Sequence, residues 1–171
     1  MVEVQSYEVV RRLSDAVELR RYPEHEVVCV DIGGNFETAG YSGFGYLASY
    51  ISGNNDQGMR IAMTSPVLQQ SAGNVETLCF VLPDAVAAAG SPRPTSPGVR
   101  VEKRPGGSVA AIIFRGGWKS HTVDKATESL RDVLKREGIA EVGDPFYARY
   151  NPPSVPGIFR RNEVLIPVSG V

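Results

Sequence analysis

Two stretches of the sequence follow the same plan, and this repeat is the strongest constraint on the fold. Residues 17–23 alternate apolar and polar side chains and end in a proline, and residues 99–105 resemble them in pattern and length. Each stretch is followed by an apolar run and a Gly-Gly pair, within 27–34 and within 109–117. Alternation is typical of strands with one buried face, and paired glycines indicate turns. A repeat at a period of about 85 residues predicts a pseudo-two-fold architecture.

An amphipathic helix is expected after the first Gly-Gly pair. Asn35 is predicted to cap it, because its side chain can accept a hydrogen bond from the first helical turn. The apolar face has the i, i+3, i+4, i+7 spacing of a helix and consists of Phe44, Leu47, Ala48 and Ile51. Three glycines each weaken the first half by about 1 kcal/mol relative to alanine: Gly40, Gly43 and Gly45. Either the start of the helix frays, or something approaches its backbone closely.

The second copy predicts a second helix between residues 120 and 138. Ser120 is expected to cap this helix and Gly138 to end it. Its apolar stripe consists of Val123, Ala126, Leu130, Val133 and Leu134. In both copies, a strand that carries a proline is expected to follow the helix.

Residues 58–67 are predicted to form the strand that follows the first helix. The apolar residues Met59, Ile61 and Met63 recur at every second position, which is the period of a strand. Pro66 ends this strand, because proline cannot donate to the ladder of hydrogen bonds. Two methionines on one face form an adaptable wall that can fit a flat apolar ligand. Filling of the protein core is the alternative role for these side chains.

The segment 83–98 contains four prolines and is predicted to be a semi-rigid connector. We therefore expect a single domain of 171 residues, with internal repeats at about 1–83 and 98–171 joined by this connector. The predicted fold class is α+β. Because each sheet must bury one face, two curved sheets are expected to meet face to face, with the helices outside.

The composition argues against several classes of protein. The formal net charge is −1, so a polyanionic partner such as DNA is not favoured. No apolar run approaches the ~20 residues that span a membrane, and residues 1–6 lack the pattern of a secretion signal. Cys29 and Cys79 are expected to be small buried hydrophobes in a reducing compartment, with a disulfide between them as the alternative. We expect a soluble cytoplasmic protein, and a monomer is favoured.

The sequence contains no catalytic signature. It lacks a nucleophile elbow, a His/Glu metal pair on a helix, a phosphate-binding glycine loop and a Cys-x-x-Cys motif. Glu18, Glu102 and Glu163 lie on expected strands, where ion pairs with neighbouring arginines are the ordinary explanation. A binding protein is therefore favoured over an enzyme, and no residue is assigned a catalytic role.

Six segments, in order and over nearly the whole length, resemble motifs of the SOUL/heme-binding protein family. This resemblance implies a distorted β-barrel of two βαβ-type repeats flanked by two helices. It also implies non-covalent binding of heme or another tetrapyrrole in an apolar groove beside the first helix. The segments are Val17–Tyr22, Tyr50–Asn55, Ile61–Val67, Phe80–Pro83, Tyr150–Pro153 and Arg160–Val164.

A porphyrin needs apolar faces, cations for its two propionates and, optionally, an iron ligand. Arg60 is the candidate for a propionate. Arg160 and Arg161 are further candidates, with structural ion pairs as their alternative role. The residues expected to surround the macrocycle are Phe44, Leu47, Ile51, Met59, Arg60, Ile61, Met63 and Val67.

The sequence departs from the family at the iron ligand. Members that use an axial histidine carry it directly before the tyrosine of the second strand, where this chain has Arg21. Weak candidates for the metal are His25, His121 and Met63, with a surface position or core packing as the alternative. We therefore expect binding mainly by shape and burial, with free-base porphyrin bound nearly as well as heme.

Three functions are compatible with the resemblance. A carrier or buffer of heme or porphyrin is favoured. An enzyme that opens the tetrapyrrole ring or removes its metal would need a residue such as His25, His121 or Glu37 at the reacting atoms. A small-ligand sensor is the third possibility, and it would need a separate partner because no DNA-binding segment is present.

Overall fold

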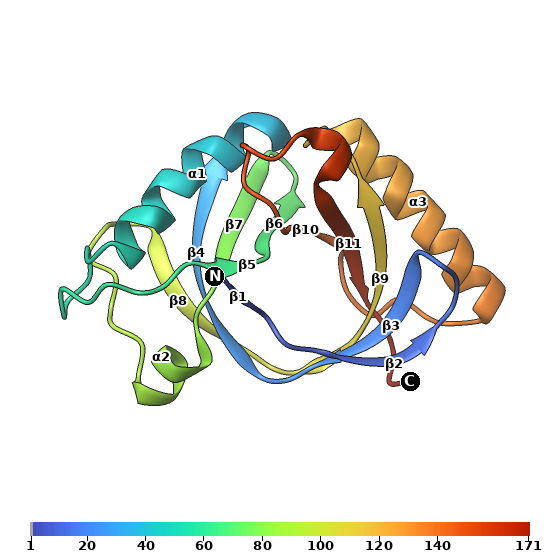
Figure 1. Cartoon of the computed structure of the whole chain (residues 1–171), viewed down its shortest axis with the longest axis horizontal. Coiled ribbons are helices and arrows are strands. Elements are labelled where there is room, and N and C mark those ends of the chain that lie inside the picture. Colours follow the sequence, from blue (N-terminus) through green and yellow to red (C-terminus); the bar gives the residue numbers. More distant parts are fainter. Residues whose placement is uncertain (1) are drawn as a thin grey trace. The chain divides into compact units, whose positions relative to one another are not determined.

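The computed structural model describes residues 2–171, which form two compact units. Unit 1 contains the N-terminal residues up to Gln5 together with Glu24–Pro105. Unit 2 contains Ser6–Pro23 and Gly106–Val171. Each unit has a mainly antiparallel sheet and one long helix, so the predicted α+β class is confirmed (Figure 1).

The main sheet of unit 1 has the strand order β6-β7-β4-β8, and all neighbours are antiparallel. Helix α1 packs on β4 and β7, and β1 and β5 form a small parallel pair (Figure 1). The elements are β1 (Glu3–Val4), β4 (His25–Gly33), α1 (Phe36–Ile51), β5 (Thr64–Ser65), β6 (Val67–Ala72), β7 (Val75–Val81), α2 (Asp84–Ala89) and β8 (Val99–Arg104).

The sheet of unit 2 has the order β2-β3-β9-β11-β10, again with antiparallel neighbours. Helix α3 packs on β9 and β11. The elements are β2 (Glu8–Arg12), β3 (Val17–Tyr22), β9 (Gly107–Arg115), α3 (Ser120–Glu137), β10 (Phe146–Arg149), the 3-10 helix η1 (Gly157–Phe159) and β11 (Arg161–Pro167).

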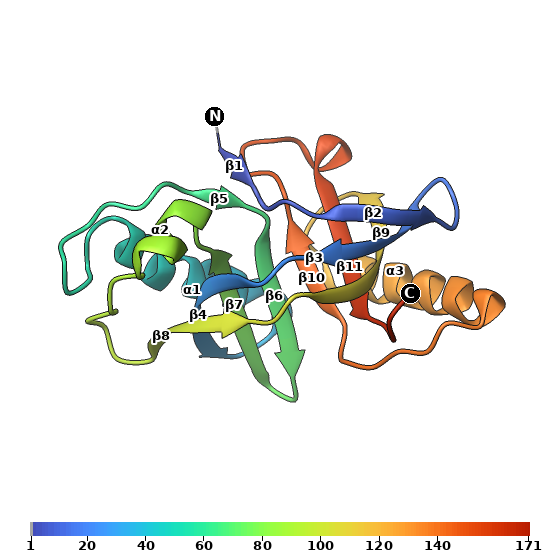
Figure 2. The same ribbon diagram turned by 90° about the horizontal axis from the view of Figure 1, so that it is seen from below.

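The strands that open the two sequence repeats pair in opposite units. β3 pairs with β9 in unit 2, and β8 pairs with β4 in unit 1 (Figure 2). When β3 is matched with β8, both units have the same strand order, with β2 as an extra edge strand in unit 2. The internal repeats at about 1–83 and 98–171 stay a prediction, since the compact units are assembled from other segments.

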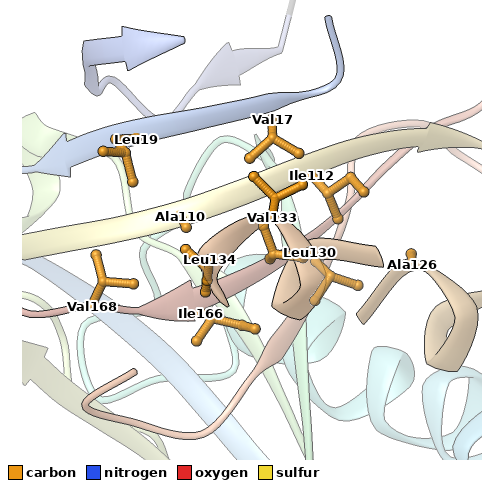
Figure 3. Packing of buried hydrophobic residues seen from close by; sticks show 11 residues of the cluster. Val17, Leu19, Ala110, Ile112, Ala126, Leu130, Val133, Leu134, Ile166 and Val168 are labelled. Atoms are coloured by element: carbon orange, nitrogen blue, oxygen red, sulfur yellow. The ribbon is translucent and has the colours of Figure 1, made fainter. Parts of the chain in front are cut away.

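Helix α3 buries its apolar stripe against one face of the unit 2 sheet. Val17 and Leu19 of β3 lie in this core together with Ala110 and Ile112 of β9 (Figure 3). Every second residue of each strand contributes, because successive side chains point to opposite faces. The predicted helix stripe is confirmed, since all of its residues pack in or against this core: Val123, Ala126, Leu130, Val133 and Leu134.

Helix α1 approaches its sheet closely at Gly43. A Cβ atom there would lie 3.1 Å from Cδ2 of Leu78 and 3.2 Å from Cγ1 of Ile32. At Gly45, two residues further along, a Cβ atom would meet nothing within 4 Å. Close approach of the sheet therefore accounts for Gly43, as one of the two sequence interpretations expected.

Most of the predicted helix ends are confirmed. Asn35 caps α1, because its Oδ1 accepts a hydrogen bond of 2.9 Å from the backbone N–H of Thr38. Gly138 ends α3 in the left-handed conformation, with φ of 67°. The expected cap at Ser120 is wrong: Lys119 holds that position without a capping side-chain hydrogen bond, and Ser120 is already helical. Within residues 2–171, no helix has the length and apolarity needed to cross a membrane.

The predicted strand at residues 58–67 is largely wrong. Residues 58–63 belong to no strand, and pairing starts only with β5 and β6. The segment is tied to the end of α1 instead, where the N–H of Ile61 donates to the carbonyl of Ile51 over 2.8 Å. The proline-rich segment 83–98 is also more ordered than expected, because it contains the short helix α2.

Replacement of Gly43 by leucine is expected to push α1 away from its sheet. Overpacking of this kind lowers the free energy of unfolding by about 1–3 kcal/mol. The matched variant Gly45→Leu gains a similar helix propensity, about 0.8 kcal/mol, without a clash. Urea unfolding should therefore rank Gly43→Leu about 1–3 kcal/mol below Gly45→Leu. Equal stabilities would contradict the close approach.

Candidate functional site

The side chains predicted to surround a macrocycle gather around one apolar cluster in unit 1. Leu47 and Ile61 are buried members of this cluster. Phe44 is 44% exposed, and its ring contacts the ring of Phe80 edge-on, with centroids 5.2 Å apart. The partly buried residues packed against the cluster include Ile51, Met59, Met63 and Val67. Their role as ligand contacts stays a prediction.

Arg60 is exposed and lies between the partly buried Met59 and the buried Ile61. Its neighbours therefore hold the backbone against the apolar cluster while the guanidinium group stays in water. A cation at the border of an apolar surface can form an ion pair with the carboxylate of a ligand whose apolar part is buried on that surface.

Asn55, the last residue of the motif Tyr50–Asn55, fixes the segment that carries these residues. Its side chain is buried and donates to the carbonyls of Tyr50 (3.0 Å) and Met59 (2.8 Å). Its Oδ1 accepts from the N–H groups of Gln57 (3.2 Å) and Met59 (3.0 Å). Asn55 thus ties the end of α1 to the methionine-bearing segment. The resemblance marked Asn55 only as part of a motif, and an asparagine inside an Asn-Asn-Asp loop resembles ordinary turn chemistry, so this role was not predicted.

The two other arginines considered for a propionate lie in unit 2 and have structural partners there. Arg161 pairs with Glu163, with Nη2 and Oε1 2.5 Å apart. Arg160 donates to the backbone carbonyls of Val155 and Pro153, each over 2.7 Å. These contacts favour the structural alternative for Arg160 and Arg161.

Glu163 belongs to a buried ion network on the face of the unit 2 sheet that points away from α3. Arg20 is fully buried and binds both oxygens of the buried Glu163 carboxylate, at 2.6 and 2.9 Å. Its Nε also donates to Glu18 over 2.8 Å, and its Nη1 donates to the hydroxyl of Tyr22 over 3.0 Å. The Cζ atom of Arg20 lies over the ring of Tyr7, 4.1 Å from its centroid. Such complete pairing is what allows charges to stay buried.

The network shifts the pKa values of its members. Burial alone would lower the pKa of Arg20, but the hydrogen bonds and charge of Glu163 outweigh it and raise this pKa. Burial raises the pKa of Tyr22 to about 12, against the opposing charge of Arg20. The arginine is therefore charged and the tyrosine neutral over the physiological range. The expected ion pairs of Glu18 and Glu163 are confirmed, and so is that of Glu102, which pairs with Arg100.

The three candidate metal ligands lie at separate places in the chain. His25 begins β4 in unit 1, and the exposed His121 lies in the first turn of α3 in unit 2. Met63 packs against the apolar cluster of unit 1. Arg21 pairs with Glu8 at 3.5 Å. Across residues 2–171, no three His, Cys, Asp or Glu side chains come together as a metal site.

Cys29 and Cys79 form a disulfide, so the expectation of two free thiols is wrong. They occupy directly opposite positions on the neighbouring strands β4 and β7, with their Cα atoms 4.2 Å apart. Opposite positions on antiparallel strands bring Cβ atoms within reach of a disulfide. The inference of a reducing compartment, which rested on free thiols, loses its support.

A model of the SOUL heme-binding protein family matches residues 2–167. The chain belongs to the SOUL family. Heme-binding protein 1 of Mus musculus is 30% identical over 126 residues, which span 69% of this chain and 65% of the mouse protein. This chain therefore matches slightly less than two thirds of that relative.

Two solved structures share the fold of this chain. The C-terminal domain of EcmrR has a TM-score of 0.70 at 12% identity, and the match covers 96% of this chain and 99% of that domain. A hydrolase from Listeria innocua has a TM-score of 0.60 at 13% identity, and the match covers 94% of each chain. At such identities the likeness concerns the fold alone.

Two of the SOUL-like motifs meet in the ion network. Val17–Tyr22 supplies Arg20 and its partner Glu18, whereas Arg160–Val164 supplies Glu163. These motifs therefore stabilise the sheet of unit 2. The motif Tyr50–Asn55 instead fixes the segment that carries the candidate binding residues in unit 1.

Replacement of Arg20 by methionine is expected to destabilise the protein strongly, because it leaves the buried Glu18 and Glu163 without this cation. Breaking a buried pair on one side costs about 3–5 kcal/mol of the free energy of unfolding. The matched Arg11→Met variant breaks the exposed pair with Glu137, which should cost at most about 1 kcal/mol. Urea unfolding of both variants measures the difference. Similar losses of unfolding free energy in the two variants would show that the buried ion network contributes little to stability.

Proposed function

We propose that this protein binds heme or a related tetrapyrrole non-covalently in an apolar groove of unit 1 beside α1, as a carrier or buffer. The observation that carries this proposal is the match to the SOUL heme-binding protein family over residues 2–167. The similarity to mouse Heme-binding protein 1 supports the same ligand class.

The residues around the apolar cluster suit a flat macrocycle. Ile51, Met59 and Met63 are only partly buried, so their side chains can offer apolar surface to a ligand. Flexible thioether side chains adapt to a planar face. Leu47 and Ile61 are buried and would support this surface from below. Arg60, exposed at the same segment, would pair with a propionate.

Binding would depend on shape and burial more than on the iron. A bound heme supplies an iron centre and a large apolar plane. Met63 is the candidate for a thioether contact in unit 1, and His25 belongs to the same unit. A groove of this kind should hold free-base protoporphyrin with an affinity within a few-fold of that of hemin.

Titration with hemin tests the proposal, with the Soret band as the readout. Met63→Arg places a charge against the apolar cluster and should weaken hemin binding at least about tenfold, because an unpaired charge is costly in apolar surroundings. Met63→Gln changes polarity without adding charge and should weaken binding less. The control Val142→Arg adds the same charge at a residue of unit 2 that is 64% exposed, and should bind as the wild type does.

Circular dichroism would first establish that each variant is folded. If both folded Met63 variants bind hemin with wild-type affinity, the binding site does not include the segment around Met63. A wild-type protein that leaves the hemin spectrum unchanged would refute the proposed function itself. Analysis of the products formed with hemin and a reductant would separate a carrier from a tetrapyrrole-modifying enzyme.

A further inference from the structure

The disulfide lies on the face of the unit 1 sheet that points away from α1. Successive side chains of a strand point to opposite faces, and the neighbours of both cysteines pack under the helix. Cys29 and Cys79 must therefore face the other way. These neighbours in the apolar cluster are Val28, Val30, Leu78 and Phe80.

Arg104 contacts both sulfur atoms of this disulfide. Its Nη2 atom lies 3.4 Å from Sγ of Cys79 and 3.8 Å from Sγ of Cys29. Arg104 is the last residue of β8, which pairs with β4 and so runs beside Cys29. In the register of the sheet Arg104 lies opposite His25 and Arg100 lies opposite Cys29, so the long side chain of Arg104 must extend along the sheet to reach the sulfurs.

The charge of Arg104 is only weakly engaged by its carboxylate neighbour. Glu102 lies 3.5 Å from Nη2 of Arg104, whereas its other oxygen lies 2.5 Å from Nε of Arg100. Hydrogen bonds and the charge of Arg100 lower the pKa of Glu102, so this carboxylate is ionised at neutral pH. Because Arg100 holds Glu102 more closely, the guanidinium of Arg104 remains available to an anion that forms on a sulfur.

We propose that Cys29 and Cys79 form a thiol–disulfide exchange site, at which Arg104 stabilises the cysteine thiolate released by a reducing thiol. The thiolate of a dithiol attacks one cysteine sulfur and forms a new S–S bond with it. The bond between the cysteines breaks, and its electron pair leaves on the other cysteine as a thiolate. The second thiol of the reductant, deprotonated, then displaces the remaining cysteine. The reductant leaves as a disulfide, and the cysteines have gained two electrons.

Whichever of the two sulfurs is attacked, the guanidinium of Arg104 lies close to the one that leaves. Both sulfurs lie within 3.8 Å of Arg104 Nη2, so the leaving thiolate meets a cation whichever cysteine departs. A nearby cation lowers the pKa of a thiol, and a less basic thiolate is a better leaving group. The sulfurs themselves are buried, but the Arg104 side chain is 31% exposed, so the group that contacts them reaches solvent.

The experiment compares the reduction equilibrium of the wild type with that of Arg104→Gln. Each protein is equilibrated at about pH 8.5, near the ordinary thiol pKa, with mixtures of reduced and oxidised dithiothreitol. Alkylation and mass spectrometry then give the reduced fraction. A partly exposed cation at this distance should lower a thiol pKa by about one unit, so the equilibrium constant for reduction should fall about five- to tenfold in Arg104→Gln.

Lys103→Gln is the matched control, because it removes a positive charge from the same strand yet leaves the contacts of Glu102 with Arg100 and Arg104 in place. Lys103 pairs instead with Glu24, at 3.1 Å. The equilibrium constant of Lys103→Gln should stay within about twofold of the wild type, and Arg104→Lys should recover part of the lost reduction. Equal constants for Arg104→Gln and Lys103→Gln would overturn the proposal. So would two free thiols that persist in the wild type after treatment with oxidised glutathione. None of these readouts depends on tetrapyrrole binding.

Discussion

Burial of one apolar helix stripe against one face of an antiparallel sheet is the constraint on which both units depend. Leu47 of α1 and Leu130 of α3 are completely buried in this way. Once these stripes are in place, the period of two along each strand decides which side chains meet the helix. The remaining strand residues must face the other side, and there the two units differ.

On those opposite faces, the matched strands β3 and β8 carry charges with different consequences. In unit 2, Arg20 and Glu163 are removed from water, so every donor and acceptor around them needs a partner. In unit 1, Arg100 and Glu102 remain partly exposed, and a covalent bond between β4 and β7 lies beside them. With the same strand order, unit 2 is thus stabilised on this face by buried ion pairs and unit 1 by a disulfide.

The features that the sequence predicted well are encoded by near neighbours in the chain. The cap at Asn35, the end at Gly138 and the apolar stripe of α3 follow from short-range spacing. The stripe predicted for α1 is only partly right, because Leu47 is buried but Phe44 is 44% exposed. The alternation at residues 58–63 resembled a strand, but a strand also needs a partner, and here the backbone bonds to the end of α1 instead. The disulfide joins residues 50 positions apart, and such pairings are invisible to local patterns.

β3 and β8 each pair with a strand of the other sequence repeat, and this affects how the chain folds during its synthesis. β3 can form a hairpin with β2 early, but its other edge must wait for β9, which begins at Gly107. The free edge of β4 similarly waits for β8. A half-synthesised chain therefore presents open strand edges, which are templates for unwanted pairing. Chaperones that cover such edges during translation would protect this protein until its later strands leave the ribosome.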